Sequence, residues 1–146
     1  MAAEENKTLV RRVIEEGFNK GNLGVADQLC ASNYRSHDPL LQNLPSGPDA
    51  FKQSINVYRT AFPDSRITIE EQVAQGNLVA TRWTAQGTHN GQLMGIQPTG
   101  KRVQVSGIQI DRVEQGKIVE TWINYDALGM MQQLGVVSTQ ALQAGR

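Results

Sequence analysis

The stretch Gly107–Gly135, GIQIDRVEQGKIVETWINYDALGMMQQLG, decides the fold. A strand of alternating side chains turns at Gln115-Gly116, returns as a second strand, and meets the carboxylate of Asp126 where helix-like sequence begins. This order predicts a hairpin followed by a short helix. Two interpretations of Asp126 fit its position: a general base at the mouth of a sheet-lined cavity, or an ordinary helix cap.

The strand pattern extends upstream of this stretch. A period of two predicts strands from Arg66 to about Val73, from Val79 to Gln86 and over 103–113, and the last strand runs over 117–125. The dipeptide Asn90-Gly91 predicts a further hairpin, in which 92–95 pair back. One face of the long strand carries Val103, Val105, Gly107, Gln109, Asp111 and Val113.

Helical spacing of apolar residues precedes the strands. Residues 5–19 carry an apolar stripe, and a short second helix is predicted over 25–30. An irregular stretch is predicted over 33–45. A third helix should begin near Ser46, which can cap it, and should end before Pro63. The last helix takes its apolar face from Leu128, Met131 and Leu134.

Helices followed by an antiparallel meander are typical of the α+β class. A long twisted sheet curls, and helices can close its concave face around a cavity. We therefore predict a cone-shaped α+β barrel, in which the N-terminal helices close a curved antiparallel sheet. The chain has 146 residues, so we expect a single domain over 1–146.

Composition excludes several classes of function. Fourteen basic and fourteen acidic side chains cancel, so no charge excess favours nucleic acid as a partner. No apolar run reaches the length of a membrane span, so no membrane partner is expected. The start, MAAEENK, has no apolar signal core, and we expect a cytoplasmic protein. A single cysteine, Cys30, excludes an internal disulfide.

Short motifs in a fixed order point to a family. They are Val10-Arg11-Arg12 with Glu16 and Phe18-Asn19, Tyr34 with His37-Asp38-Pro39, Phe62-Pro63-Asp64, Gly87-Thr88-His89 with Gly91 and Gly95, Pro98-Thr99-Gly100, Gly116-Lys117-Ile118, and Glu120 with Trp122, Asp126, Gly129 and Gln133-Leu134-Gly135. In their order and spacing the chain resembles the SnoaL-like polyketide cyclase family of the nuclear-transport-factor-like superfamily, from about Asn6 to Gly135.

The resemblance implies a cone-shaped α+β barrel that acts without a cofactor. Characterised relatives close the final ring of aromatic polyketides by an intramolecular aldol condensation. The acid that follows their tryptophan-containing strand is the proposed acid/base, and Asp126 occupies that position. The resemblance also implies a small hydrophobic or aromatic ligand, and a homodimer joined by the outer sheet face. The alternative is a non-catalytic module that binds a small ligand or serves in assembly.

Five further residues are candidates for substrate binding. Gln109 stands where the cyclases place a histidine; it can hydrogen-bond a carbonyl but cannot shuttle a proton, or it can simply pair within the sheet. His37 lies in a predicted loop, where it lines a pocket or hydrogen-bonds locally. Trp122, Tyr34 and Trp83 form an aromatic wall or plain core packing. The spacing of His37, Asp38 and His89 does not favour a metal site, and we expect no metal.

Overall fold

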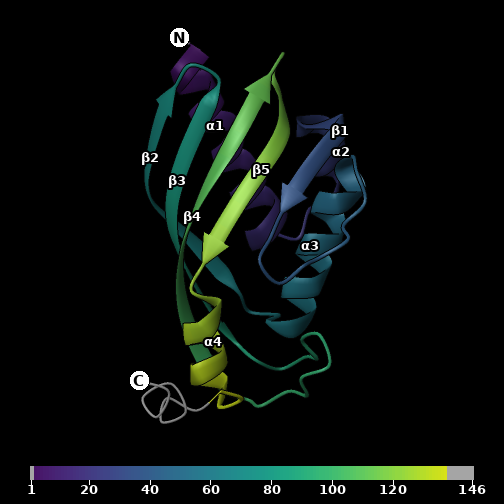
Figure 1. Ribbon diagram of the computed structural model, residues 1–146, viewed down its shortest axis with the longest axis vertical. Coiled ribbons are helices and arrows are strands. Elements are labelled where there is room, and N and C mark those ends of the chain that lie inside the picture. The colour runs from purple at the N-terminus through teal and green to yellow at the C-terminus, as the bar shows by residue number, and fades with distance from the viewer. Residues whose placement is uncertain (1, 138–146) are drawn as a thin grey trace.

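A curved five-stranded sheet with helices packed behind it makes up the molecule (Figure 1), which the computed structural model describes over residues 2–137. Strands β2 (Arg66–Gln75), β3 (Leu78–Thr88), β4 (Arg102–Glu114) and β5 (Lys117–Tyr125) form an antiparallel meander, as predicted. The sheet order is β1-β5-β4-β3-β2, so β1 and β2 are its edges and the sheet does not close on itself. The α+β prediction is confirmed.

Strand β1 (Cys30–His37) was not predicted, because its sequence suggested irregular structure. It pairs with β5 in parallel, so the sheet is mixed rather than purely antiparallel. Only Cys30 and Tyr34 on this strand are buried, which leaves no period-two pattern in the sequence. The strand exists because β5 supplies its hydrogen-bond partners, with Arg35 opposite Glu120 and His37 opposite Trp122.

The N-terminal helix changes its winding part-way along. Helix α1 (Ala2–Arg12) continues as the π-helix η1 (Val13–Asn19) and is followed by α2 (Gly24–Leu29). Val10, Val13 and Ile14 are buried against the sheet, as their spacing predicted. Gly17 lies so close to α3 that an added Cβ would stand 2.8 Å from the ring of Phe51. The π-helical segment therefore includes the residue at which η1 packs closely against α3.

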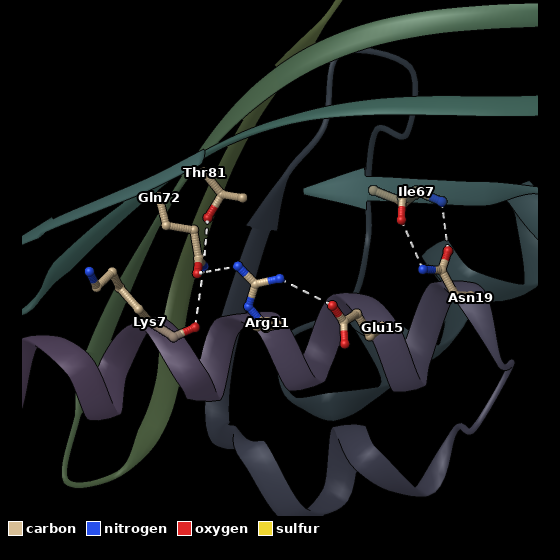
Figure 2. Close-up of polar contacts among 7 residues, drawn as sticks. All are labelled: Lys7, Arg11, Glu15, Asn19, Ile67, Gln72 and Thr81. Carbon is tan, nitrogen blue, oxygen red and sulfur yellow. Dashed lines mark hydrogen bonds and ion pairs between the residues drawn. The ribbon is translucent and has the colours of Figure 1, made fainter. Parts of the chain in front are cut away.

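Polar side chains fasten this helix to the edge strand β2 (Figure 2). The side-chain amide of Asn19 donates to the carbonyl of Ile67 at 2.9 Å and accepts from its N–H at 2.6 Å. Further along, the amide nitrogen of Gln72 donates to the Lys7 carbonyl and to the hydroxyl of Thr81 on β3, each at 3.2 Å. Asn19 thus satisfies both backbone groups of an edge residue, as a neighbouring strand would.

Helix α3 (Pro48–Ala61) packs behind β1, and helix α4 (Ala127–Leu134) follows β5. Ser46 does not cap α3. The N-cap is Gly47, whose positive φ of 86° suits a glycine and which has no side chain to make a cap hydrogen bond. On α4 the buried residues are Met130 and Leu134, whereas Leu128 is exposed, so the buried face is turned from the one predicted.

The hairpin predicted at Asn90-Gly91 is wrong. Residues 89–101 form a long loop between β3 and β4, in which the described pairing is one bridge between Leu93 and Ile96. The N–H groups of Asn90 and Gly91 donate to the carbonyl of Ala61 at the end of α3, each at 3.1 Å. An added Cβ on Gly91 would lie 1.8 Å from the Thr60 carbonyl oxygen. The glycine serves close packing on α3 rather than a tight turn.

Two apolar clusters fill the space between helices and sheet. The larger lies under α1, η1, α2 and α3, and the smaller joins Phe62 and the 89–101 loop to β4 and α4. The residues predicted to share one face of β4 do so, and this face is the inner one, because Val103, Val105, Asp111 and Val113 are all buried. Among residues 2–137 no helix has both the length and the apolar character that a membrane crossing needs.

Candidate functional site

A cavity of about 100 Å³ lies between the two apolar clusters. Its wall is largely apolar. Lining residues come from η1, α3 and α4 and from each of the strands β2, β3, β4 and β5. Its polar lining residues include Asp38, Tyr58 and Tyr125, which are joined by hydrogen bonds, together with Gln109, Ser65 and Gln86. The remaining lining residues include Phe18, Phe62, Ile67, Trp83, Val103, Val105, Ile123 and Met130. The site can therefore hold an apolar ring and present polar groups to substituents on it.

Asp38 is the one carboxylic acid among the described residues that line this cavity. It follows β1 directly, and its side chain is 7% exposed. Its Oδ1 accepts hydrogen bonds from the backbone N–H groups of Leu40 at 2.8 Å and Leu41 at 3.2 Å, which hold the carboxyl in place. Burial raises the pKa of Asp38, although these hydrogen bonds and one from Tyr58 act in the opposite direction.

Two tyrosines of the cavity wall hydrogen-bond in a chain that starts at Asp38. The Tyr58 hydroxyl, from α3, lies 3.1 Å from Oδ1 and 3.0 Å from Oδ2 of Asp38. It also lies 2.8 Å from the hydroxyl of Tyr125, at the end of β5. Burial raises the pKa of both phenols, so both keep their protons at neutral pH. The three groups form an unbroken hydrogen-bonded chain.

A second buried network supports Gln109 and Trp83 on the cavity wall. Gln109 accepts from the Trp83 indole N–H at 3.1 Å and donates to Oδ2 of Asp111 at 2.9 Å. Oδ1 of Asp111 accepts from the Thr121 hydroxyl at 2.6 Å, and Thr121 in turn accepts from Tyr34 at 2.9 Å. Burial raises the pKa of Asp111 to about 6. This network fixes the rotamers of Gln109 and Trp83 on the cavity wall.

Trp83 lies flat over the backbone of β4. An added Cβ on Gly107, its cross-strand partner, would stand 2.5 Å from the indole ring. The absence of a side chain at this position lets the ring rest on the strand instead of filling the cavity. Gly107 is therefore a determinant of cavity shape.

Asp126 lies outside this cavity. It is exposed, and its Oδ1 accepts from the Gly129 N–H at 2.9 Å as the N-cap of α4. The helix-capping interpretation is thus confirmed as one role of this side chain. The backbone N–H of Asp126 donates to the backbone carbonyl of Ser106, an exposed residue of β4. The next residue toward β5, Tyr125, is the one that lines the cavity.

The other predicted binding residues divide between two places. Gln109 and Trp83 line the cavity, whereas His37 and Trp122 line a separate groove of about 510 Å³. In the groove the two rings stack with centroids 5.7 Å apart, and His37 Nε2 lies 2.7 Å from the carboxylate of Glu120. That hydrogen bond is the largest cause of the lowered pKa of Glu120. Asp38 and Ile123 line both hollows, so the groove and the cavity are neighbours.

Tyr34 lines neither the cavity nor the groove. It is buried in the larger cluster, with an edge-on contact to Phe51. His89 is buried beside Phe62, and its Nδ1 accepts from the Thr99 backbone N–H at 3.2 Å. Over residues 2–137 no group of three histidine, cysteine or acidic side chains could hold a metal ion.

Sequence reasoning missed the three hydrogen-bonded polar residues of the cavity wall, Asp38, Tyr58 and Tyr125. Tyr58 fits the apolar stripe of α3, which is the pattern of a core residue, and Tyr125 shares no local pattern with it. The available signal was the acid of His37-Asp38-Pro39, placed just before a loop. However, no feature of the sequence around that motif predicts its hydrogen-bond partner Tyr58, which lies 20 residues away.

Comparisons with known proteins agree with this architecture. The family model described as SnoaL-like polyketide cyclase matches residues 8–134. The chain is similar to nogalonic acid methyl ester cyclase of Streptomyces nogalater, 29% identical over 81% of this chain and 89% of that protein. It is similar to aklanonic acid methyl ester cyclase DnrD of Streptomyces peucetius, 30% identical over 87% of this chain and 88% of the other. The structure of TsrD from Streptomyces laurentii superposes with a TM-score of 0.83 at 25% identity, covering 92% of this chain and 97% of TsrD.

Proposed function

This chain belongs to the SnoaL-like polyketide cyclase family, and from that premise we propose that it closes a ring in a polyketide-type carbonyl compound by cofactor-independent acid/base catalysis. The observation that carries the proposal is the largely apolar cavity with a few polar groups, Asp38, Tyr58, Tyr125 and Gln109 among them, on its wall. Aromatic walls suit a planar substrate, and the neighbouring groove offers room for its polar substituents.

An intramolecular aldol closure needs two proton transfers. A base removes a proton next to one carbonyl, and the oxygen of the attacked carbonyl receives a proton. Protonation of the carbonyl oxygen gains from a site that excludes water, because hydrogen bonds to developing charge are stronger there. Conjugation in an extended substrate spreads the charge of the enolate, so side chains of this chain suffice for the proposed reaction.

We further propose Asp126 as the base, an assignment that rests on the resemblance of its position to the acid of the cyclases. Its exposed carboxylate requires the reacting carbon to reach the N-terminus of α4, one residue beyond the Tyr125 that lines the cavity. The cap hydrogen bond from Gly129 leaves the second carboxylate oxygen for a proton.

Incubation with nogalonic acid methyl ester and aklanonic acid methyl ester, the compounds carried in the names of the two relatives, tests the function. Chromatography and NMR should find a cyclised isomer of unchanged mass without any added cofactor. Recovery of both esters unchanged although they bind would instead favour the non-catalytic module.

Asp126→Asn tests the residue assignment, because asparagine still caps a helix. We expect turnover to fall at least about 100-fold, the range for loss of a general base, while the thermal midpoint stays near that of the wild type. Full activity in Asp126→Asn would refute the role of Asp126. Asp27→Asn, at another exposed aspartate, is the matched control and should keep wild-type turnover.

We also propose that the protein forms a homodimer through its outer sheet face. An apolar row crosses that face over neighbouring strands: Val73 pairs with Ala80, Ala80 with Ile110, and Ile110 with Trp122. Val73, Ile110 and Trp122 are 65%, 41% and 38% exposed, and Ile108 beside them is 55% exposed. Contiguous apolar side chains at the surface favour contact with a second protein surface.

A further inference from the structure

We propose that Asp38, Tyr58 and Tyr125 form a proton relay that binds a carbonyl oxygen of the ligand in the cavity and protonates it when the new carbon–carbon bond forms. The binding half of this inference stands on the geometry alone. The protonation half rests on the proposed function. Tyr125 would be the catalytic residue, and Tyr58 and Asp38 would position its hydroxyl and return a proton to it.

The geometry assigns the end of the relay to Tyr125. The Tyr58 hydroxyl is already engaged on both sides, with Asp38 at 3.0 Å and Tyr125 at 2.8 Å. The Tyr125 hydroxyl has this one hydrogen bond, to Tyr58, among the described residues, so it keeps a free hydrogen-bonding position at the cavity. The centroid of its ring lies 6.3 Å from that of Trp83, so the two rings are neighbours on the cavity wall, where a planar ligand would rest.

The protonation state of Asp38 sets the direction of the hydrogen bonds. When Asp38 is ionised, Tyr58 donates to it and Tyr125 donates to Tyr58, so the cavity meets only lone pairs of Tyr125. When Asp38 is neutral, its Oδ2 can donate to Tyr58, Tyr58 donates to Tyr125, and the Tyr125 O–H points to the ligand. Oδ1 keeps its two backbone donors in both states. Only the neutral state offers a donor to a carbonyl.

Protons balance across the proposed step. The carbon next to one carbonyl gives a proton to the base, and its electron pair forms the new carbon–carbon bond. The π pair of the attacked carbonyl moves to its oxygen, which takes the proton of Tyr125. Tyr125 recovers a proton from Tyr58, and Tyr58 recovers one from Asp38. The proton released by the base then restores Asp38 through water, so substrate and product are isomers.

Few other titratable groups face Asp38. Tyr58 approaches from α3 and Tyr125 from β5, and both remain protonated. The neighbouring His37 turns to Glu120 in the groove. A pH dependence that disappears when Asp38 alone is replaced therefore belongs to Asp38.

Binding of 1-tetralone and tetralin tests the relay without turnover. Both are bicyclic, but only 1-tetralone has a carbonyl oxygen, which accepts hydrogen bonds and cannot donate them. At a pH below the raised pKa of Asp38, approached by lowering the pH in steps as far as the protein stays folded, the wild type should bind 1-tetralone about tenfold more tightly than tetralin, which is the value of one good hydrogen bond. Tyr125→Phe keeps the ring and should bind the two compounds equally. Equal binding by the wild type, no binding of either compound, or an unchanged preference in Tyr125→Phe would overturn the inference.

The pH profile separates a relay from a merely structural cluster. In the wild type the preference for 1-tetralone should fall as pH rises through the raised pKa of Asp38. In Asp38→Asn the amide donates to Tyr58 at every pH, so the preference should persist. In Tyr58→Phe the Tyr125 O–H has no competing acceptor, and the preference should again persist. A wild-type pH dependence in either variant would contradict the assigned roles.

The two proposals fail in different ways. A tetralone preference that needs Tyr125, together with unchanged polyketide esters, would support the binding site and refute the cyclase function. Cyclisation of the esters at the wild-type rate by Tyr125→Phe would support the function and refute protonation by the relay.

Discussion

Asp111 and Asp38 are both buried acids near the cavity, yet they differ in what they can do. Asp38 lines the cavity and reaches it through tyrosine hydroxyls. Asp111 is 1% exposed, and its hydrogen-bond partners among the described residues are Gln109 and Thr121, which themselves support the wall. We therefore assign Asp111 a positioning role for Gln109 and Trp83.

The raised pKa of Asp111 makes a prediction about stability. Because burial raises it to about 6, the folded state holds this proton more tightly than the unfolded state. The resulting stability is complete below about pH 4 and is lost as pH rises through about 6, by at most about 3 kcal/mol. Urea unfolding from pH 4 to 7 should show this loss in the wild type relative to Asp111→Asn. Parallel pH curves for the two proteins would contradict it.

Gly107 offers a second test at the residue scale. In Gly107→Ala the new methyl group must displace the Trp83 ring, 2.5 Å away, toward the cavity. We expect a loss of about 1–3 kcal/mol in unfolding free energy and weaker binding of tetralin. Thermal melts and tryptophan fluorescence measure both effects. Ser106→Ala, at the exposed neighbouring residue, is the control; equal behaviour of the two variants would argue against this packing role.

At the scale of elements, one side chain joins the N-terminal helix to an edge strand. Asn19 makes both of its hydrogen bonds to the backbone of Ile67 (Figure 2). Asn19→Ala leaves a partly buried donor and acceptor without these partners, so we expect a loss of about 1–3 kcal/mol in urea unfolding. Asn19→Asp keeps the acceptor but sets a charge against the Ile67 carbonyl and should not restore stability. Wild-type stability in Asn19→Ala would show that the packing of η1 alone holds β2.

The predicted elements succeeded where periodicity was strong. The stripe of residues 5–19 and the alternation along β4 report a buried face directly, because helix and strand repeat with different periods. The predictions for strand β1 and the 89–101 loop were wrong because neither segment has a periodic pattern that reports its conformation. Their conformation depends on hydrogen bonds to β5 and to the Ala61 carbonyl, which local sequence does not encode.

At the scale of the whole molecule, the exposed apolar row predicts the oligomeric state. Ile110→Lys places a charge at its centre, and we expect light scattering to give the mass of a single 16.1 kDa chain for this variant and twice that mass for the wild type. Leu128→Lys, at an exposed apolar residue of α4, should remain dimeric. A monomeric wild type at micromolar concentration would contradict the proposed homodimer.

The sequence by itself determined the α+β class, the inner face of β4 and the hairpin that ends at Asp126, because each depends on periodicity and turn chemistry within one segment. Only the tertiary structure decided which groups meet in the cavity. Asp38 lies 20 residues from Tyr58, and Tyr58 lies 67 from Tyr125, so no local pattern relates them. Their hydroxyls and carboxyl come within hydrogen-bonding distance because β1, α3 and β5 pack around one apolar interior, where buried polar groups must find partners among themselves.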